Sequence, residues 1–276
     1  MRKFLYIMCS LLCAVFIACS KSGDTAKPKL AEELRKEHHA DSLALKVGVL
    51  QTEDCLPAFV AKDEGIFDSL GVDVRLCHYT SMLDYDRALT NGKLHGVFTD
   101  TKYLEHLNKV PSLGMQQKKT FDMPWQLVSN RKSRIRQLKQ FTDKMIAMSR
   151  HSVTDYLCDR MIDSIKMNRE RVFRIQVNDA DLRLRMLLDN EIDAAWLPEP
   201  QATVAKKAGH KVLMSSGSRG EKFAVLAFSD KSFGDERIKK QIELFVKAYD
   251  TAYGRIKKGG KKYRQRLVKQ YFKYDI

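Results

Sequence analysis

The chain has 276 residues, of which 49 are Lys or Arg and 34 are Asp or Glu, giving a formal net charge of +15. With 44% hydrophobic residues it has the ordinary composition of a globular protein with a buried core. The basic residues are spread along the chain without a nucleic-acid-binding motif, so we expect no nucleic acid partner.

The first residues predict export. Arg2 and Lys3 precede an apolar stretch, Phe4 to Ala18, which is too short to span a bilayer and is typical of a secretory signal. The sequence around Cys19 resembles the lipobox of bacterial lipoproteins, in which a small residue precedes the cysteine that is acylated. We therefore predict a signal peptide at 1–18, lipidation of Cys19, and an anchor and tether at 19–44. The alternative is an ordinary secretory signal with an incidental cysteine.

Strands and helices alternate in the first half of the chain. Strands are expected at 45–50, 72–77 and 96–99, and helices at 56–70 and 82–91, with a further helix opening at Asp100. This order favours parallel pairing with right-handed crossovers.

The same pattern recurs from residue 144 onwards. Strands are expected at 144–148, 172–177 and 192–197, and helices from Ser152 to Met167 and from Ala180 to Leu188. Two further strands, 125–129 and 223–229, flank this unit and are the natural crossings between two lobes. The lobes are then 45–128 with 219–276, and 129–218. A basic helix over 235–272 is expected to bury a stripe of Leu244, Val246, Ala248, Tyr249 and Ala252.

Several segments resemble one family when they are taken in order. Ala58 to Phe67 with Gly71 to Val74, Ala88 to Val97, Ser152 to Thr154, Asp193 to Ala195, and Leu197 to Thr203 are similar to solute-binding proteins for nitrate, sulfonates, taurine and thiamine-pyrimidine precursors. The resemblance runs from about residue 45 to residue 250.

This resemblance implies a fold, a location and partners. The expected fold class is α/β, a periplasmic binding protein of type 2, with a mostly parallel sheet in each lobe and two crossing strands. The expected location is the cell envelope, as a membrane-anchored lipoprotein facing the periplasm. The expected partners are a small-molecule solute and the permease of an ABC transporter, with the chain itself a monomer.

Candidate ligand contacts follow the predicted strands, because open α/β sheets bind ligands at the carboxyl ends of their strands. They are Thr52, Glu53, Asp54, Tyr79, Thr80, Asp100, His151, Ser152, Thr154 and Glu199. Ser81, Thr99 and Asp179 lie at the same strand ends. Trp125 near the first crossing completes the set, because its ring can stack on a flat solute or, alternatively, pack in the core.

Two groups of these candidates point to different ligands. Hydroxyls and free N–H groups from Ser152 to Thr154, at a helix N-terminus, suit an anion or a carbonyl, although Ser and Thr there are also ordinary helix caps. Carboxylates at several strand ends, such as Asp54 and Glu199, suit a solute with hydrogen-bond donors, although each is equally suited to capping or to solvent. We favour a thiamine-pyrimidine-like heterocycle, and a small anion such as a sulfonate or nitrate is the alternative.

No motif in the chain indicates catalysis, a metal or a cofactor, so we expect none. The sequence also leaves open an enzyme on the same scaffold, similar to the fungal thiamine-pyrimidine synthases but without their cysteine cluster, and a ligand-sensing lobe of a signalling system. Beyond Cys19 the chain has Cys55, Cys77 and Cys158, and a Cys55–Cys77 disulfide is a hypothesis.

Overall fold

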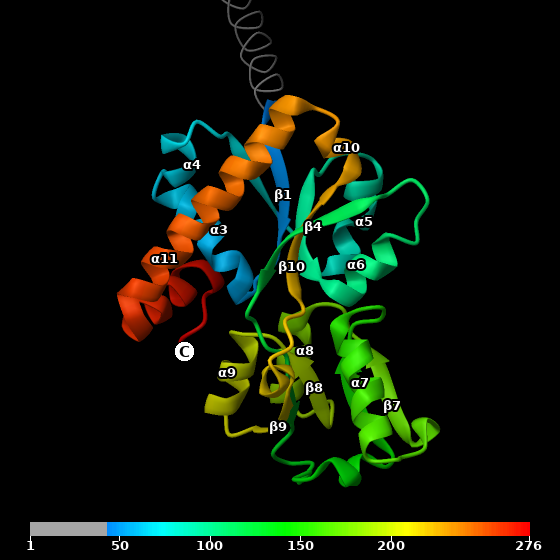
Figure 1. Ribbon diagram of the computed structural model, residues 1–276. Helices are drawn as coiled ribbons and strands as arrows, with labels where there is room; N and C mark the ends of the chain where they lie inside the picture. The colour runs from blue at the N-terminus through cyan, green and yellow to red at the C-terminus, as the bar shows by residue number, and fades with distance from the viewer. Residues whose placement is uncertain (1–42) are drawn as a thin grey trace, which may run out of the picture. The chain divides into compact units, whose positions relative to one another are not determined.

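Two five-stranded sheets form the part of the chain that the structure describes, residues 43–276 of a computed structural model. The predicted signal peptide, Cys19 and nearly all of the predicted tether lie outside the described residues. The strand orders are β2-β1-β3-β10-β4 and β7-β6-β8-β5-β9, so both sheets follow the same plan (Figure 1).

The first sheet combines two directions. Strands β1 (Leu45–Val49), β2 (Val74–His78) and β3 (Gly96–Asp100) are parallel, whereas β10 (Ala224–Ser229) runs antiparallel between β3 and β4 (Met115–Phe121). Its helices are α3 (Leu56–Asp63), α4 (Ile66–Ser69), α5 (Met82–Thr90), α6 (Thr101–Leu107), α10 (Asp230–Phe233) and α11 (Glu236–Phe272), and α11 packs on α3 (Figure 1).

The second sheet repeats this arrangement. Strands β6 (Lys144–Met148), β7 (Val172–Gln176) and β8 (Ala194–Leu197) are parallel, and β5 (Gln126–Ser129) runs antiparallel between β8 and β9 (Lys211–Ser215). Its helices are α7 (Val153–Ser164), α8 (Ala180–Leu188) and α9 (Gln201–Lys207). Single 3-10 turns lie at Glu53–Cys55, Leu138–Phe141, Arg169–Arg171 and Ser216–Arg219.

The chain passes between the sheets twice, at residues 122–125 and 216–223. The predicted α/β fold with two lobes is confirmed, and each sheet is mixed because one of its five strands, β10 or β5, runs against the other four. The lobe boundary that we placed at residue 128 falls inside β5, which pairs within the second sheet. Because only these two short connections join the two sheets, a hinge motion between them is permitted.

Some local predictions are wrong for identifiable reasons. The single helix expected over 56–70 is broken at Gly65, whose φ of 67° lies in the left-handed region and ends the first helix. Strands β4 and β9 were missed. In the last helix, the predicted residues Ala248, Tyr249 and Ala252 are buried, but Leu244 and Val246 are only half-buried and Phe245 takes their place in the main core.

Among residues 43–276, no helix is long and apolar enough to cross a membrane.

Candidate functional site

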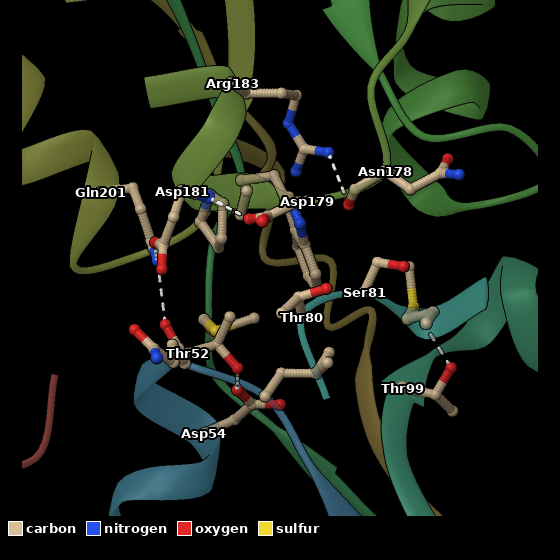
Figure 2. Close-up of a pocket in the computed structure, with 17 residues that line it drawn as sticks. Thr52, Asp54, Thr80, Ser81, Thr99, Asn178, Asp179, Asp181, Arg183 and Gln201 are labelled. Atoms are coloured by element: carbon tan, nitrogen blue, oxygen red, sulfur yellow. Dashed lines mark hydrogen bonds between the residues drawn. The ribbon is translucent and has the colours of Figure 1, made fainter. Parts of the chain in front are cut away.

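A small cavity of about 70 Å³ lies where strand ends of the two sheets meet, and Figure 2 shows the side chains around it. The first sheet contributes residues that follow β1 and β2 and one at the end of β3; the second contributes residues that follow β7 and β8. We call this cavity the central pocket. Its lining is Leu50, Gln51, Thr52, Asp54, Thr80, Ser81, Met82, Thr99, Met123, Trp125, Asn178, Asp179, Ala180, Asp181, Arg183, Pro198 and Gln201.

A buried carboxyl group stands on the first-sheet side. Asp54 is held in the turn after β1, where the Thr52 hydroxyl donates to its Oδ1 at 2.5 Å and Tyr249 Oη donates to its backbone carbonyl at 2.7 Å. Burial raises the pKa of Asp54 to about 6, outweighing the hydrogen bond from Thr52. The group therefore changes charge close to neutral pH.

A buried guanidinium stands on the second-sheet side. Arg183 in α8 is 3% exposed, and it donates from Nε to the Trp196 carbonyl at 2.9 Å and from Nη1 to the Val177 carbonyl at 2.7 Å. Figure 2 shows a further hydrogen bond, from Nη1 to the Asn178 carbonyl at 3.2 Å. Within residues 43–276 it forms no ion pair, and burial lowers the pKa of Arg183 to about 10. It is thus a buried positive charge whose hydrogen bonds go to neutral carbonyls.

Gln201 connects the two sides of the pocket. Its side chain is fully buried and donates from Nε2 to the Gln51 carbonyl at 2.9 Å and to Asp181 Oδ1 at 2.6 Å (Figure 2). Its Oε1 is buried without a hydrogen-bond partner among the described residues. A buried oxygen of this kind is an acceptor available to a ligand donor.

Trp125 lies in the first connection between the sheets and also lines the pocket. Its backbone N–H donates to Ser216 Oγ at 3.0 Å, and Ser216 N–H donates back to its carbonyl at 3.0 Å, which ties the two connections together. The ring is 6% exposed and belongs to the main apolar core. It therefore packs in the core, one of the two roles that the sequence left open, and it also lines the pocket, while stacking on a solute stays a prediction.

Four of the predicted ligand contacts lie in the pocket, namely Thr52, Asp54, Thr80 and Trp125, and so do Ser81, Thr99 and Asp179. The other three predicted carboxylates, Glu53, Glu199 and Asp100, lie elsewhere. Glu53 forms an ion pair with Arg264 of α11 and faces a second cavity of about 610 Å³. Glu199 accepts from Gln126 Nε2 at 2.6 Å and from Thr203 N–H at 3.1 Å.

Four other predicted ligand contacts form interactions within the protein, at or near the first turn of α7. Ser152 caps this helix by accepting from Thr154 N–H at 3.1 Å, and Thr154 Oγ1 accepts from Ser149 N–H at 2.8 Å. Asp100, fully buried, reaches the same helix from the other sheet. The His151 ring stacks on His106 at 4.1 Å between centroids.

Tyr79 is the remaining predicted contact. Its ring meets Tyr85 edge-on at 5.8 Å, and its backbone N–H donates to the Val49 carbonyl at 3.0 Å. It packs beside the pocket rather than lining it.

Sequence reasoning missed several lining residues. Arg183 and Asp181 lie inside a predicted helix rather than at a strand end, and in the segment before Gln201 only Glu199 was predicted as a ligand contact. One signal was available for Asn178 and Asp181, since both flank Asp179 at a predicted strand end.

The hypothesised disulfide is not formed. Cys55 is a buried thiol that accepts a hydrogen bond from Leu50 N–H at 3.4 Å, and it is not bonded to Cys77. Within residues 43–276, no cluster of three or more His, Cys, Asp or Glu side chains is placed to hold a metal ion.

Two mixed sheets of this order, joined by two connections and with a pocket at their strand ends, are the fold of the periplasmic binding proteins. The chain belongs to the NMT1/THI5-like family, whose profile matches residues 52–257. No curated protein sequence is significantly similar to it.

Solved structures support the fold at low sequence identity. The alkanesulfonate-binding protein SsuA from Xanthomonas axonopodis pv. citri, bound to MOPS, is 13% identical with a TM-score of 0.69, over 82% of this chain and 78% of that one. The ligand-binding component of an ABC-type import system from Staphylococcus aureus, with zinc bound, is 15% identical with a TM-score of 0.68, over 84% and 80%. The nitrate-binding protein NrtA from Synechocystis PCC 6803 is 12% identical with a TM-score of 0.69, over 83% and 66%.

Proposed function

We propose that this chain is the solute-binding component of an ABC importer and that it captures a small organic molecule in the central pocket. The observation that carries the proposal is the position of this pocket, between strand ends of two sheets joined by only two connections. The NMT1/THI5-like family membership and the fold of the structural neighbours support it.

The size of the pocket supports capture by closure. Its volume of about 70 Å³ is well below the range of about 300–1,000 Å³ that is typical of pockets for drug-sized ligands. Entry of a solute therefore requires the loops of the two sheets to move apart. A solute that contacts both sides then favours the closed form by its differential affinity for it.

The charges of the pocket favour a solute with hydrogen-bond donors. Among the described residues, Asp54, Asp179 and Asp181 line it against a single cation, Arg183, and Gln201 Oε1 adds an acceptor without a partner there. Trp125 offers an aromatic face. A heterocycle of the thiamine-pyrimidine type, which is flat and carries an amino group, matches these features.

A small anion is the second candidate, favoured by one specific observation. Arg183 is buried at the pocket without a carboxylate partner among the described residues, and a guanidinium in that state is stabilised by an anionic ligand. The small volume also suits a compact group.

A thermal-shift screen of the protein lacking residues 1–28 separates these candidates. We expect an aminopyrimidine to stabilise it, by about 2.7 kcal/mol at a hundredfold excess over Kd. Asp54→Asn is then expected to weaken binding about 10- to 100-fold, because it removes a charged acceptor. The matched control Asp68→Asn removes an exposed carboxylate from α4 and is expected to leave binding unchanged.

Three further outcomes each identify a different function. Stabilisation by sulfonates or nitrate, lost in Arg183→Gln but not in Asp54→Asn, identifies an anion binder. Recovery of a chemically altered solute identifies an enzyme. If the protein binds the solute, but cells that lack the chain still take up the solute normally, the result points to a sensor.

The proposed location has its own test. We propose that the chain is exported and anchored through Cys19, facing the periplasm beside its permease. Labelled palmitate is expected to be incorporated by the wild type and not by Cys19→Ala, which moves to the soluble fraction. Equal labelling of both proteins would contradict the anchor.

A further inference from the structure

Asp100 joins the N-termini of two helices that belong to different sheets. It ends β3 and caps α6, where its Oδ1 accepts from Lys102 N–H at 2.9 Å and Tyr103 N–H at 2.8 Å. The same Oδ1 accepts from Val153 N–H, the first residue of α7, at 3.0 Å. The side chain is fully buried. One carboxylate oxygen thus receives three backbone N–H groups from two helices.

The N-terminus of a helix such as α7 attracts anions, because its first N–H groups lack partners within the helix and the helix dipole is positive there. In this protein those groups are already used. Val153 N–H donates to Asp100, Thr154 N–H to Ser152 Oγ at 3.1 Å, and Asp155 N–H to the Ser152 carbonyl at 3.1 Å. No N–H of the first three α7 residues remains for an anionic solute.

The side chains of this turn are directed inward as well. Ser152 Oγ donates to the Ser149 carbonyl at 2.7 Å, and Thr154 Oγ1 accepts from Ser149 N–H at 2.8 Å. None of Val153, Ser152 or Thr154 lines the central pocket. The turn that the sequence offered as an anion site is therefore closed by the protein's own groups.

The contact between α6 and α7 extends beyond Asp100. The rings of His106 and His151 stack at 4.1 Å, and Lys102 Nζ lies 4.9 Å from the ring centroid of Tyr156. A solute anion at Val153 would have to displace Asp100 and separate these pairs.

We propose that Asp100 is a specificity-determining residue that takes the place of an anion at the N-terminus of α7 and so excludes sulfate- and sulfonate-like groups from it. The inference rests on the proposed solute-binding function and restricts where an anionic solute can bind. An anion that binds this protein must do so elsewhere, for instance at Arg183.

The test uses Asp100→Ser, because serine is also a preferred helix cap and preserves the cap of α6. Its shorter side chain releases Val153 N–H. The matched control is Asp235→Ser, since Asp235 caps α11 through Arg237 N–H and Ile238 N–H and does not bridge the sheets. Sulfate and methanesulfonate are titrated by calorimetry against chloride of equal ionic strength. The solution is held at about pH 8, above the pKa of about 7 to which burial raises Asp100.

We expect Asp100→Ser to bind sulfate at least tenfold more tightly than the wild type, and Asp235→Ser to behave as the wild type. If the folded wild type and folded Asp100→Ser bind sulfate with the same affinity, the inference is overturned. The NMR signal of the Val153 amide gives a reading from the wild type alone, and it is expected to stay unmoved by sulfate; a specific shift overturns the inference. If no heterocycle stabilises the protein in the thermal-shift screen, the proposed solute class is refuted. The comparison of sulfate binding between the wild type and Asp100→Ser keeps its meaning in that case.

Discussion

The stability of this protein is expected to fall between about pH 5 and about pH 8 because of Asp100. Burial raises the pKa of Asp100 from its ordinary value of 3.8 to about 7, against the three backbone N–H groups that lower it. The folded state therefore binds a proton that the unfolded state releases, over the interval between these two pKa values. Stability in that interval decreases as pH rises.

The magnitude follows from the size of the shift. A difference of about three pH units corresponds to about 4 kcal/mol between the two protonation states. About 2–3 kcal/mol of this is expected to be lost between pH 5 and pH 8, since the unfolded state is already ionised at pH 5. The variant Asp100→Asn has no charge to gain and is expected to lack this part of the pH dependence.

Urea denaturation followed by tryptophan fluorescence measures the difference. Histidines also titrate in this range, so the wild type is compared with Asp100→Asn at each pH rather than with itself. Asp235→Asn is the control, because hydrogen bonds from the first turn of α11 lower the pKa of Asp235 below this range. Parallel pH profiles for the wild type and Asp100→Asn would show that the carboxyl group is not held in a desolvated site.

Two further predictions concern packing and thiols. Gly96→Ala is expected to destabilise the protein by about 1–3 kcal/mol. The Cβ that alanine adds would lie 2.3 Å from a phenylalanine ring of β10 and 2.7 Å from a backbone oxygen. Gly254→Ala, where a Cβ meets nothing within 4 Å, is the control and is expected to stabilise slightly; equal effects on thermal unfolding would contradict the packing. In the protein lacking residues 1–28, Cys77 is expected to react with Ellman's reagent first, because Cys55 and Cys158 are fully buried and burial raises both thiol pKa values. Simultaneous labelling of all three thiols would argue against this burial.

The alternation of strands and helices was predictable because it depends on short-range patterns. The strands at 45–49, 74–78 and 144–148 lie within one or two residues of their predicted bounds. The exceptions involve partners that are distant in sequence. Strand β4 has the exposed, polar sequence of an edge strand, and its pairing with β10 more than 100 residues later defines it.

The site was predicted in part for the same reason. Thr52, Asp54 and Thr80 follow strands directly, so the strand-end rule finds them. Arg183 lies inside α8, and its charged side chain is buried only because that helix packs on β8. Gln201 likewise enters the pocket because α9 begins where the two sheets meet.

The sequence by itself determined most of the strands and helices and several local caps, since each of these depends mainly on residues within about four positions. Asp100 was expected to open a helix and Ser152 was considered as a helix cap, and both side chains cap helices in the structure. Only the tertiary structure decided what those caps do. It brings Asp100 to Val153, 53 residues away, and thereby uses a potential anion site for contact between the two sheets. It also leaves Arg183 buried at a pocket whose lining includes carboxylates from both sheets, because strand order and the two connections between the sheets, rather than local sequence, set which strand ends meet.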